Sequence, residues 1–439
     1  MSDTPYDEHF VSWFRAVTPY INAFRGKTFV IAFGGKAVAS EFAKTLAYDV
    51  NLLVSLGIRL VLVHGARPQI EEELREKNLE SVYHRGYRVT DAETLDCVLD
   101  AVGSVYLEIE AMLSQGLPNT PMANSRIRVI GGNFITGQPI GVLDGIDMHY
   151  AGKVRKVDAE GINAQLGLGN IVLLNCEGPS PTGEIFNLQM EEAAEALAAA
   201  LKADKLVYLT DSRGVTNPGG ELLDAMTADE VAEIIKSGDW LSPDIRRYLP
   251  CAERASRAGV GRVHLIGFEQ DGALLRELFT HDGVGTVVTR ESLENIREAK
   301  PDDIGALIAL IEPMEEEGIL VHRPRELLER EIEHFSIMEH DGIIVGCAAL
   351  YRHSDEEAEL ACLAVGAEHR EWGYGEQLMR RIERRARKAG VKRLFVLTTR
   401  TEHWFVERGF KLGSVDDLPA RKRDMYNYQR RSKVLFKTL

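Results

Sequence analysis

The sequence lacks the cysteine pairs that disulfide frameworks and zinc clusters require. Its five cysteines form no C-x-x-C pair, and its twelve histidines show no H-E-x-x-H or other metal-binding spacing, so we expect no metal site. No run of about 18 apolar residues is present, so we expect no segment of the sequence to span a bilayer as a helix. Residues 1–8 include neither a basic nor an apolar region, which argues against a secretory signal. We therefore expect a soluble, cytoplasmic protein.

The charge of the 439-residue chain is unevenly distributed. The total is −15, but residues 370–439 contain 19 Lys and Arg against 8 Asp and Glu, a local charge of +11 that leaves −26 on the rest. The negative total disfavours general nucleic-acid binding. A basic C-terminal segment is either a solvated face or a pocket for a small polyanionic ligand. The length predicts two or three domains, and the 45% hydrophobic content is typical of globular proteins.

Short apolar runs alternate with amphipathic stretches over most of the chain. This alternation predicts β-α-β units around a mainly parallel sheet. Near residue 292 the pattern changes, and we place a domain boundary there. The expected N-terminal strands are 28–33, 59–64, 171–174, 205–210 and 262–266, with helices over 41–56, 190–202 and 272–279. Beyond the boundary we expect a helix over 296–317, strands over 343–351, 359–365 and 392–397, and a long helix ending at Gly390.

The most informative motif is an R-x-x-G-x-G loop at residues 370–375, between the strand 359–365 and a helix with a basic face. Glycines allow backbone N–H groups to approach an anion closely. The helix N-terminus adds the positive end of a dipole, which suits a pyrophosphate. A glycine pair before a helix is equally typical of a plain tight turn. The succession of strand, loop, basic helix and strand is more specific.

This succession resembles the acyl-CoA-binding core of the GCN5-related N-acetyltransferases (GNAT). Residues 394–405 (LFVLTTRTEHWF) and 407–410 (ERGF) are similar to the bacterial N-acetylglutamate synthase family, and the resemblance covers essentially the whole chain. It implies an α/β protein with three parts. These are an interlacing N-terminal helix over residues 1–25, an amino-acid-kinase-like α/β/α sandwich with a mainly parallel sheet over 26–291, and a GNAT-type mixed α/β domain over 292–439.

The resemblance implies acetyl transfer from acetyl-CoA to the α-amino group of L-glutamate, the first step of arginine biosynthesis. In that family the strand before the loop separates from its neighbour, and pantetheine pairs with it like an added strand. Glu359 at the mouth of this opening is the candidate base, although a strand-end glutamate is often merely solvated. The residues expected to bind acetyl-CoA are Cys362, Leu363, Val365, Arg370, Gly373, Tyr374 and Gly375.

Arg323, Arg430 and Ser432 resemble the family's contacts with the glutamate carboxylates. The planar fork of arginine matches a carboxylate, but Arg323 taken alone is equally typical of surface charge. An acetyl-cysteine at Cys362 is the alternative to direct transfer. We prefer direct transfer, because a buried cysteine is more often a small hydrophobe. His403 and Tyr426 are both candidates for the acid that protonates the leaving thiolate.

The N-terminal part contains VLVHGARPQI at residues 61–70, which resembles acetylglutamate kinases. Those enzymes carry a lysine where this chain has Ala32, and the segment 244–247 (DIRR) lacks a lysine as well. Phosphoryl transfer needs cations to offset charge, so we predict a non-catalytic regulatory and assembly module.

The resemblance implies L-arginine as effector and a homo-oligomer, a hexamer in related proteins, interlaced through the N-terminal helix. Tyr20, His264, Glu277 and Gly283 are expected to surround the arginine. A lone histidine on a strand is nevertheless more often part of a core. An acetylglutamate kinase with an accessory acetyltransferase, and an arginine sensor with a decayed acetyltransferase, are the alternative functions.

Overall fold

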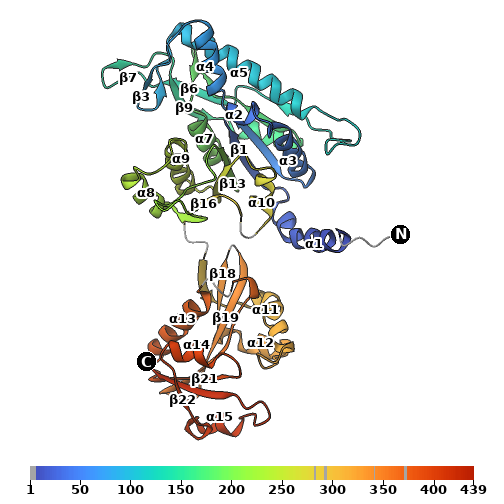
Figure 1. Cartoon of the computed structure of the whole chain (residues 1–439), viewed down its shortest axis with the longest axis vertical. Coiled ribbons are helices and arrows are strands. Elements are labelled where there is room, and N and C mark those ends of the chain that lie inside the picture. Colours follow the sequence, from blue (N-terminus) through green and yellow to red (C-terminus); the bar gives the residue numbers. More distant parts are fainter. Residues whose placement is uncertain (1–5, 281–282, 291–293, 341, 370–372) are drawn as a thin grey trace. The chain divides into compact units, whose positions relative to one another are not determined.

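An eight-stranded sheet forms the centre of the N-terminal unit, Met1–Glu291, in this computed structural model (Figure 1). The structure describes residues 6–280, 283–290, 294–340, 342–369 and 373–439. Neighbouring strands are parallel except for β15 and β16. In spatial order the strands are β14 (Ala225–Thr227), β16 (Thr286–Thr289), β15 (Arg262–Gly267), β13 (Lys205–Thr210), β1 (Thr28–Phe33), β2 (Arg59–His64), β10 (Ile171–Leu174) and β5 (Val129–Ile130).

Helices cover both faces of this sheet. Side chains alternate along each strand, so each strand contributes to an apolar core on either face. On β1, Val30 and Ala32 enter one apolar core, whereas Phe29, Ile31 and Phe33 enter the other. The predicted α/β/α sandwich is therefore confirmed. The first core involves α6 (Ala159–Gly167), α7 (Met190–Leu201), α8 (Ala228–Ser237) and α9 (Ile245–Arg257). The second involves α1 (Tyr6–Phe24), α2 (Gly35–Val38), α3 (Ala43–Ser55), α4 (Arg67–Glu76), α5 (Ala92–Leu113) and α10 (Ala273–Phe279).

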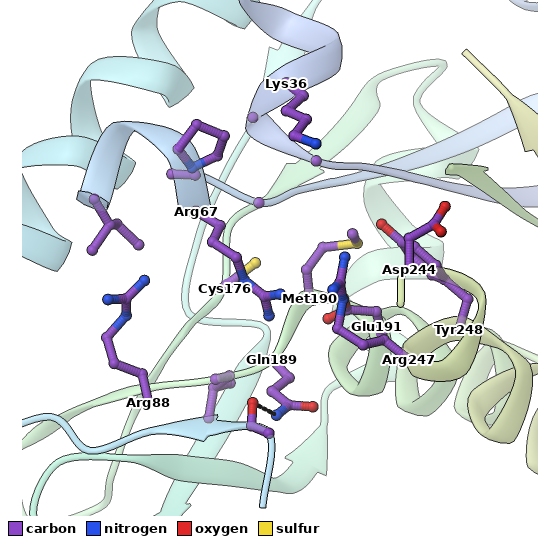
Figure 2. A pocket seen from close by; sticks show the side chains of 18 of the residues that line it. Lys36, Arg67, Arg88, Cys176, Gln189, Met190, Glu191, Asp244, Arg247 and Tyr248 are labelled. Carbon is purple, nitrogen blue, oxygen red and sulfur yellow. Dashed lines mark hydrogen bonds and ion pairs between the residues drawn. The ribbon is translucent and has the colours of Figure 1, made fainter. Parts of the chain in front are cut away.

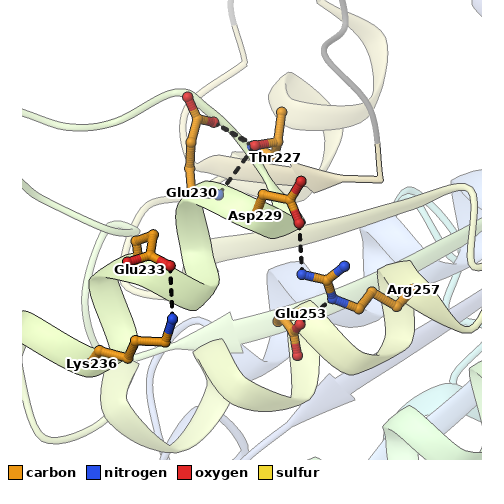
Figure 3. Close-up of polar contacts among 7 residues, drawn as sticks. All are labelled: Thr227, Asp229, Glu230, Glu233, Lys236, Glu253 and Arg257. Atoms are coloured by element: carbon orange, nitrogen blue, oxygen red, sulfur yellow. Dashed lines mark hydrogen bonds and ion pairs between the residues drawn. The ribbon is translucent and has the colours of Figure 1, made fainter.

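Exposed polar groups cap the start of helix α8 and link it to helix α9 (Figure 3). Thr227 and Glu230 cap the start of α8 reciprocally: the Glu230 N–H donates to Thr227 Oγ1 (3.2 Å), and the Thr227 N–H donates to Glu230 Oε2 (2.7 Å). Arg257 of α9 donates to Asp229 in the first turn of α8 at 2.8 Å, and also pairs with Glu253. Of these contacts, the exposed pair of Arg257 and Asp229 links the two helices.

In the described residues, four small two-stranded sheets accompany the main sheet, and the sequence patterns predicted none of them. They pair β3 (Tyr83–His84) with β4 (Tyr87–Arg88), β6 (Ile135–Pro139) with β9 (Gly152–Val157), β7 (Val142–Leu143) with β8 (Ile146–Asp147), and β11 (Glu177–Pro179) with β12 (Ile185–Asn187).

The C-terminal unit, Ser292–Leu439, is built on a mixed seven-stranded sheet. Helices α13 and α14 cover one face, and α11 and α12 the other. The strands, in spatial order, are β17 (Glu294–Glu298), β18 (Phe335–His340), β19 (Ile343–Arg352), β20 (Glu357–Val365), β21 (Arg393–Thr398), β23 (Lys433–Thr438) and β22 (Lys411–Gly413). The helices are α11 (Ile304–Glu316), α12 (Arg325–Glu331), α13 (Tyr374–Lys388), α14 (Glu402–Glu407) and α15 (Ala420–Asp424), with 3₁₀ turns η1 (Pro301–Asp303), η2 (Ile332–His334), η3 (Ala367–His369) and η4 (Val415–Asp417).

The helix expected over 296–317 is wrong in its first part. Residues 296–298 belong to β17, which pairs antiparallel with β18. Ile296 packs against the core and Glu298, on the same face of the strand, lies 4.0 Å from Arg385, whereas Arg297 on the other face binds Asp303 and Glu339. The helix itself, α11, begins only after η1. No helix of the described residues is long and apolar enough to cross a membrane.

Candidate active site in the C-terminal unit

Strands β20 and β21 begin as a parallel pair and then separate. Their paired residues run from Glu357 with Arg393 to Glu359 with Phe395, and no pairing between these two strands continues beyond that point in the described chain. The remainder of β20, Leu360–Val365, therefore presents an edge on the side of β21. Such an edge can accept an extended, amide-containing chain as if it were another strand.

A β-bulge lies within this free stretch. The register between β19 and β20 shifts between Cys347 and Ala349, and Cys362 has a φ of 49°, in the left-handed region. The Cys362 side chain is buried in the core formed with α11 and α12, where the Cys347 thiol donates to the Cys362 carbonyl at 3.5 Å. Leu363 and Val365 are half-buried against the opposite core. The structure thus places the Cys362 thiol away from the face that Leu363 and Val365 share.

Helix α13 starts close to the end of the free strand. Its N-cap, Gly373, has a φ of 76°, and a Cβ on Gly375 would lie 3.3 Å from Trp404 and 3.8 Å from Val365. Tyr374 is fully buried, and its hydroxyl bonds to His340 Nδ1 at 2.7 Å, so its side chain belongs to the core. Arg370 lies outside the described residues.

The arrangement fits acetyl-CoA. The open edge of β20 can bind the pantetheine amides, and the N-terminus of α13 can bind a pyrophosphate. Arg380, Arg384 and Arg387 are exposed along α13 and add positive charge on its outer face. The glycines keep the start of the helix free of side chains that would obstruct the phosphates.

Glu359 is the last residue of β20 that pairs with β21, and its carboxylate is buried. Its Oε2 atom lies 2.6 Å from Lys422 Nζ and 3.3 Å from His353 Nε2. Burial raises the pKa of Glu359, but the hydrogen bond from His353 and the charge of Lys422 outweigh it, so the pKa lies below its ordinary value. Glu359 is therefore an ionised acceptor at the point where the two strands part.

The Arg323 guanidinium interacts with this carboxylate, and Arg430 is a neighbour of Arg323. Arg430 donates to the carbonyls of Ile319 and Leu320, the latter at 3.1 Å, which holds it beside the chain that leads to Arg323. Burial and then the charge of Arg323 lower the pKa of Arg430, so the two cations are neighbours. Arg323 also interacts electrostatically with Cys362 and, less strongly, with Tyr351 and Glu359.

Ser432 is buried beside the Arg430 segment, and its carbonyl accepts a hydrogen bond from the Tyr426 hydroxyl at 2.6 Å. The expected substrate residues Arg323 and Arg430 are therefore neighbours, and Arg323 interacts with Glu359. The sequence analysis missed His353, Lys422 and Tyr351. Lys422 stands in a basic run with Arg421 and Arg423, and nothing in that run distinguishes the one cation that turns inward.

Comparisons with known proteins agree with this architecture. The Amino acid kinase family matches residues 27–267, and the Acetyltransferase (GNAT) family matches residues 304–410. An amino-acid acetyltransferase of Ralstonia nicotianae is 51% identical over 437 residues, 99% of this chain and 97% of that protein. The crystal structure of Neisseria gonorrhoeae N-acetylglutamate synthase with coenzyme A and L-arginine has a TM-score of 0.91 at 41% identity, covering 98% of this chain and 99% of that chain. A structure of the same protein with coenzyme A and N-acetyl-glutamate has a TM-score of 0.63 at 42% identity, with the same coverage.

The chain belongs to the N-acetylglutamate synthase family. It is an amino-acid acetyltransferase with acetyl-CoA as its cosubstrate, as the GNAT resemblance predicted.

The N-terminal unit of this acetyltransferase brings together the residues expected around arginine. Glu277 is buried, lies 2.7 Å from His264 Nδ1, and accepts the N–H groups of Val284 (2.7 Å) and Gly285 (2.9 Å). Gly283 has a φ of 58°, and a Cβ there would come within 2.7 Å of Glu277 Oε2. His264 therefore belongs to a buried polar cluster rather than to an apolar core.

Lys205 completes this cluster, and the sequence analysis overlooked it. Its Nζ lies 3.2 Å from His264 Nε2, and burial lowers the pKa of Lys205 to about 7. Tyr20 lies on α1, which packs against α10, and interacts electrostatically with Arg262. The hydrogen bonds of Glu277 within the cluster already engage both of its carboxylate oxygens.

The kinase-like features also have clear positions in this acetyltransferase. Ala32 is fully buried in β1 and brings no charge to the end of that strand. Lys36 is exposed in α2 and pairs with Asp211 at 2.6 Å. Arg246 and Arg247 occupy the start of α9. The chain therefore lacks a lysine at position 32, where the kinases that this part resembles carry one.

Proposed function

We propose that this acetyltransferase acts on L-glutamate and forms N-acetyl-L-glutamate and CoA, the first step of arginine biosynthesis. The observation that carries this proposal is the pair of neighbouring guanidiniums, Arg323 and Arg430, of which Arg323 interacts with Glu359. Two adjacent cations suit a substrate with two carboxylates, because each carboxylate can accept charge-assisted hydrogen bonds. The gonococcal relative, whose structure contains N-acetyl-glutamate, supports this choice.

The glutamate ammonium must first lose a proton to become a nucleophile. Glu359 draws that proton away, directly or through one water, and its lowered pKa keeps the carboxylate ionised for this step. The neutral amine then attacks the thioester carbonyl, so that the C–N bond forms and the C–S bond breaks. A second amine proton then protonates the sulfur that the acyl group has left, which gives CoA. Overall, the reaction releases one proton to solvent.

The acetyl group passes directly to the amine. The Cys362 side chain is buried in the core with Ala349, Ala364 and α11, whereas Leu363 and Val365 pack against the opposite core. A backbone N–H near the bulge of β20 is suitably placed to polarise the carbonyl. Direct transfer therefore needs fewer movements than an acetyl-cysteine route.

An assay of thiol release tests the proposal. Purified protein with acetyl-CoA should release CoA with L-glutamate, and much more slowly with L-glutamine, which lacks the second carboxylate. Consumption of ATP with N-acetyl-L-glutamate should be absent, because Ala32 and Arg246 provide no catalytic lysine. ATP turnover without thiol release would reverse the assignment in favour of a kinase.

We propose further that L-arginine regulates the enzyme by feedback through the N-terminal unit, bound near Tyr20, His264, Glu277 and Gly283. The gonococcal complex with L-arginine supports an arginine site in this family. The buried Glu277 carboxylate is the natural partner of the guanidinium, provided that its bonds within the cluster rearrange. Titrating L-arginine into the thiol-release assay measures the sign and strength of the effect, and Glu277→Gln should weaken it.

We propose a homo-oligomer, a hexamer, assembled through α1, and a cytoplasmic location, where both substrates are available. Helix α1 packs on its own unit through Val17, but Phe10, Trp13 and Phe14 are 61%, 55% and 52% exposed. Such an apolar stripe is typical of an interface. The mass in solution should fall for a Phe10→Glu/Phe14→Glu variant and stay unchanged for Leu168→Glu, an isolated exposed apolar side chain.

A further inference from the structure

One cation of the basic C-terminal segment turns inward and meets the buried carboxylate of Glu359. Lys422 is the third residue of the short helix α15 (Figure 1), between Arg421 and Arg423, which are both exposed. Its Nζ atom lies 2.6 Å from Glu359 Oε2, and the two side chains are only 23% and 8% exposed. An ammonium group loses solvation when it is buried, so it needs a compensating charge there. Lys422 is thus matched to Glu359 rather than to solvent.

The two oxygens of the Glu359 carboxylate have different surroundings. Lys422 and His353 both contact Oε2, and His353 Nε2 lies 3.3 Å from it. The other oxygen, Oε1, has no hydrogen-bond partner among the residues that the structure describes. Glu359 stands where β20 and β21 separate, so this oxygen is available to a molecule bound in the opening.

The segment that carries Lys422 is anchored on both sides by other residues. Leu418, just before α15, is buried in a core with Phe395. Tyr426, just after α15, donates its hydroxyl to the carbonyl of Ser432 at 2.6 Å. Because these contacts hold the segment without Lys422, its ion pair can be removed and its role measured in a folded protein.

We propose that Lys422 is a positioning residue for acetyl transfer, which holds the Glu359 carboxylate by Oε2 and leaves Oε1 to take up the proton of the substrate amine. This inference rests on the proposed role of Glu359 as the base of that reaction. A carboxylate that is fixed in one orientation keeps the distance for proton transfer short. Lys422 acts through Glu359 and needs no contact with the substrate or the coenzyme.

The charges around Glu359 show why Lys422 matters most in the substrate complex. Burial raises the pKa of Glu359, and the hydrogen bond from His353 and the charge of Lys422 lower it. Tyr351 lies opposite Glu359 on β19, and burial raises the pKa of this phenol, so it brings no charge. Arg323 also interacts with Glu359, but the substrate carboxylates are expected to engage it. Lys422 is then the lysine or arginine that remains for Glu359.

The pH dependence of thiol release tests this role. In Lys422→Met, the ratio of kcat/KM for L-glutamate at pH 5.5 to that at pH 8.5 should fall about tenfold or more below the ratio of the unaltered protein, because a neighbouring opposite charge shifts a carboxyl equilibrium by this much. Most of the activity should return at pH 8.5, where the carboxylate is ionised again and is more basic. The substrate ammonium titrates equally for both proteins, so it cancels from the comparison.

Two further variants separate positioning from a structural role. Lys422→Arg keeps the positive charge and should restore the ratio of the unaltered protein. Arg423→Gln removes an exposed cation of the same helix and should leave the ratio unchanged. Thermal unfolding shows that each variant is folded. A loss of activity in Lys422→Met that is equal at both pH values would indicate a structural role and overturn the proposal.

Infrared difference spectra test the same point without any substrate. The band of the protonated carboxyl group that Glu359→Gln removes should titrate at a higher pH in Lys422→Met, measured against Lys422→Met/Glu359→Gln, than in the unaltered protein. An unchanged titration overturns the proposal, whether or not L-glutamate is the acetyl acceptor. Absence of thiol release from the unaltered protein would instead overturn the proposed function, and the infrared titration distinguishes the two failures.

Discussion

At the scale of single residues, the clearest test concerns Glu359. Glu359→Gln removes the charge that draws the proton from the ammonium, so kcat for thiol release should fall about 100-fold or more. Activity that depends on Glu359 should be lost only as the pH falls below its ordinary pKa of 4.5, because that pKa is lowered. Glu357→Gln, on the same strand and paired with Arg393, is the matched control and should retain its kcat. Equal rates in the two variants would contradict this role.

The neighbouring guanidiniums lead to a prediction about substrate binding. Arg430→Gln should raise KM for L-glutamate about tenfold or more, since a charge-assisted contact contributes about 1.5–3 kcal/mol. KM for acetyl-CoA should change little. Steady-state kinetics with each substrate varied in turn gives the comparison, and Arg423→Gln, an exposed cation of the same segment, serves as the control. A rise in KM for acetyl-CoA instead would place Arg430 in the other site.

The residues that sequence reasoning found and missed differ in a physical way. Glu359 stands at the start of an apolar strand, and Arg430 matches a family pattern, so both were visible in the chain. Lys422 was not, because its ion pair with Glu359 joins residues 63 positions apart through the tertiary fold. The direction of the Cys362 side chain depends on a bulge that shifts the register, and no composition or spacing announces such a shift.

At the scale of elements, the same substitution at the two ends of α13 tests whether the start of this helix binds acetyl-CoA. Gly373 (φ 76°) precedes the helix and Gly390 (φ 80°) follows it, so a valine at either site meets the same backbone strain. Both variants should lose stability, by about 1–2 kcal/mol or more. Only Gly373→Val should raise KM for acetyl-CoA strongly, because only that end faces the pyrophosphate. Thermal unfolding and steady-state kinetics separate the two effects, and equal KM values would remove the loop from the site.

The elements themselves were predictable to different degrees. The buried strands β1, β2, β10 and β13 occupy the predicted residues, because continuous apolar runs bounded by polar or glycine residues leave little choice. Strand β17 was mistaken for helix, since five residues dense in charge have no clear period of their own. Its pairing with β18, about 40 residues later, decides its conformation. The strands of the small two-stranded sheets, two to six residues long, are too short to carry a clear pattern.

At the scale of the whole molecule, the order of the two parts and the family were recognisable from the sequence. The basic excess after residue 370 falls on the unit that uses acetyl-CoA, which agrees with a pocket for a polyanion. The loss of lysine at Ala32 was equally visible. The pairing of charges was not visible: around one pocket of the N-terminal unit (Figure 2), Lys36 meets Asp211 and Arg247 meets Glu191 only because the fold brings these distant residues together.

The stability of the whole N-terminal unit should depend on one buried histidine. His64 is fully buried at the end of β2, and neither ring nitrogen has a hydrogen-bond partner among the described residues. Burial lowers its pKa from 6.5 to about 4. The unfolded chain therefore takes up a proton below pH 6.5 that the folded chain refuses, and stability falls as the pH drops from 6.5 toward 4. At pH 5.5 the expected loss is about 1.4 kcal/mol from this residue.

Urea unfolding at pH 7.5 and pH 5.5 measures this loss. His64→Leu should remove that part of the pH dependence and should not be destabilising at pH 7.5, because an unpartnered imidazole already costs about 1–3 kcal/mol to bury. His149→Asn replaces an exposed histidine of the same unit and keeps a residue type that tolerates its positive φ, so the pH dependence should persist there. Equal pH dependence in the His64→Leu variant and the unaltered protein would show that the imidazole is solvated, and acid lability would then have to come from the buried cluster of His264, Lys205 and Glu277.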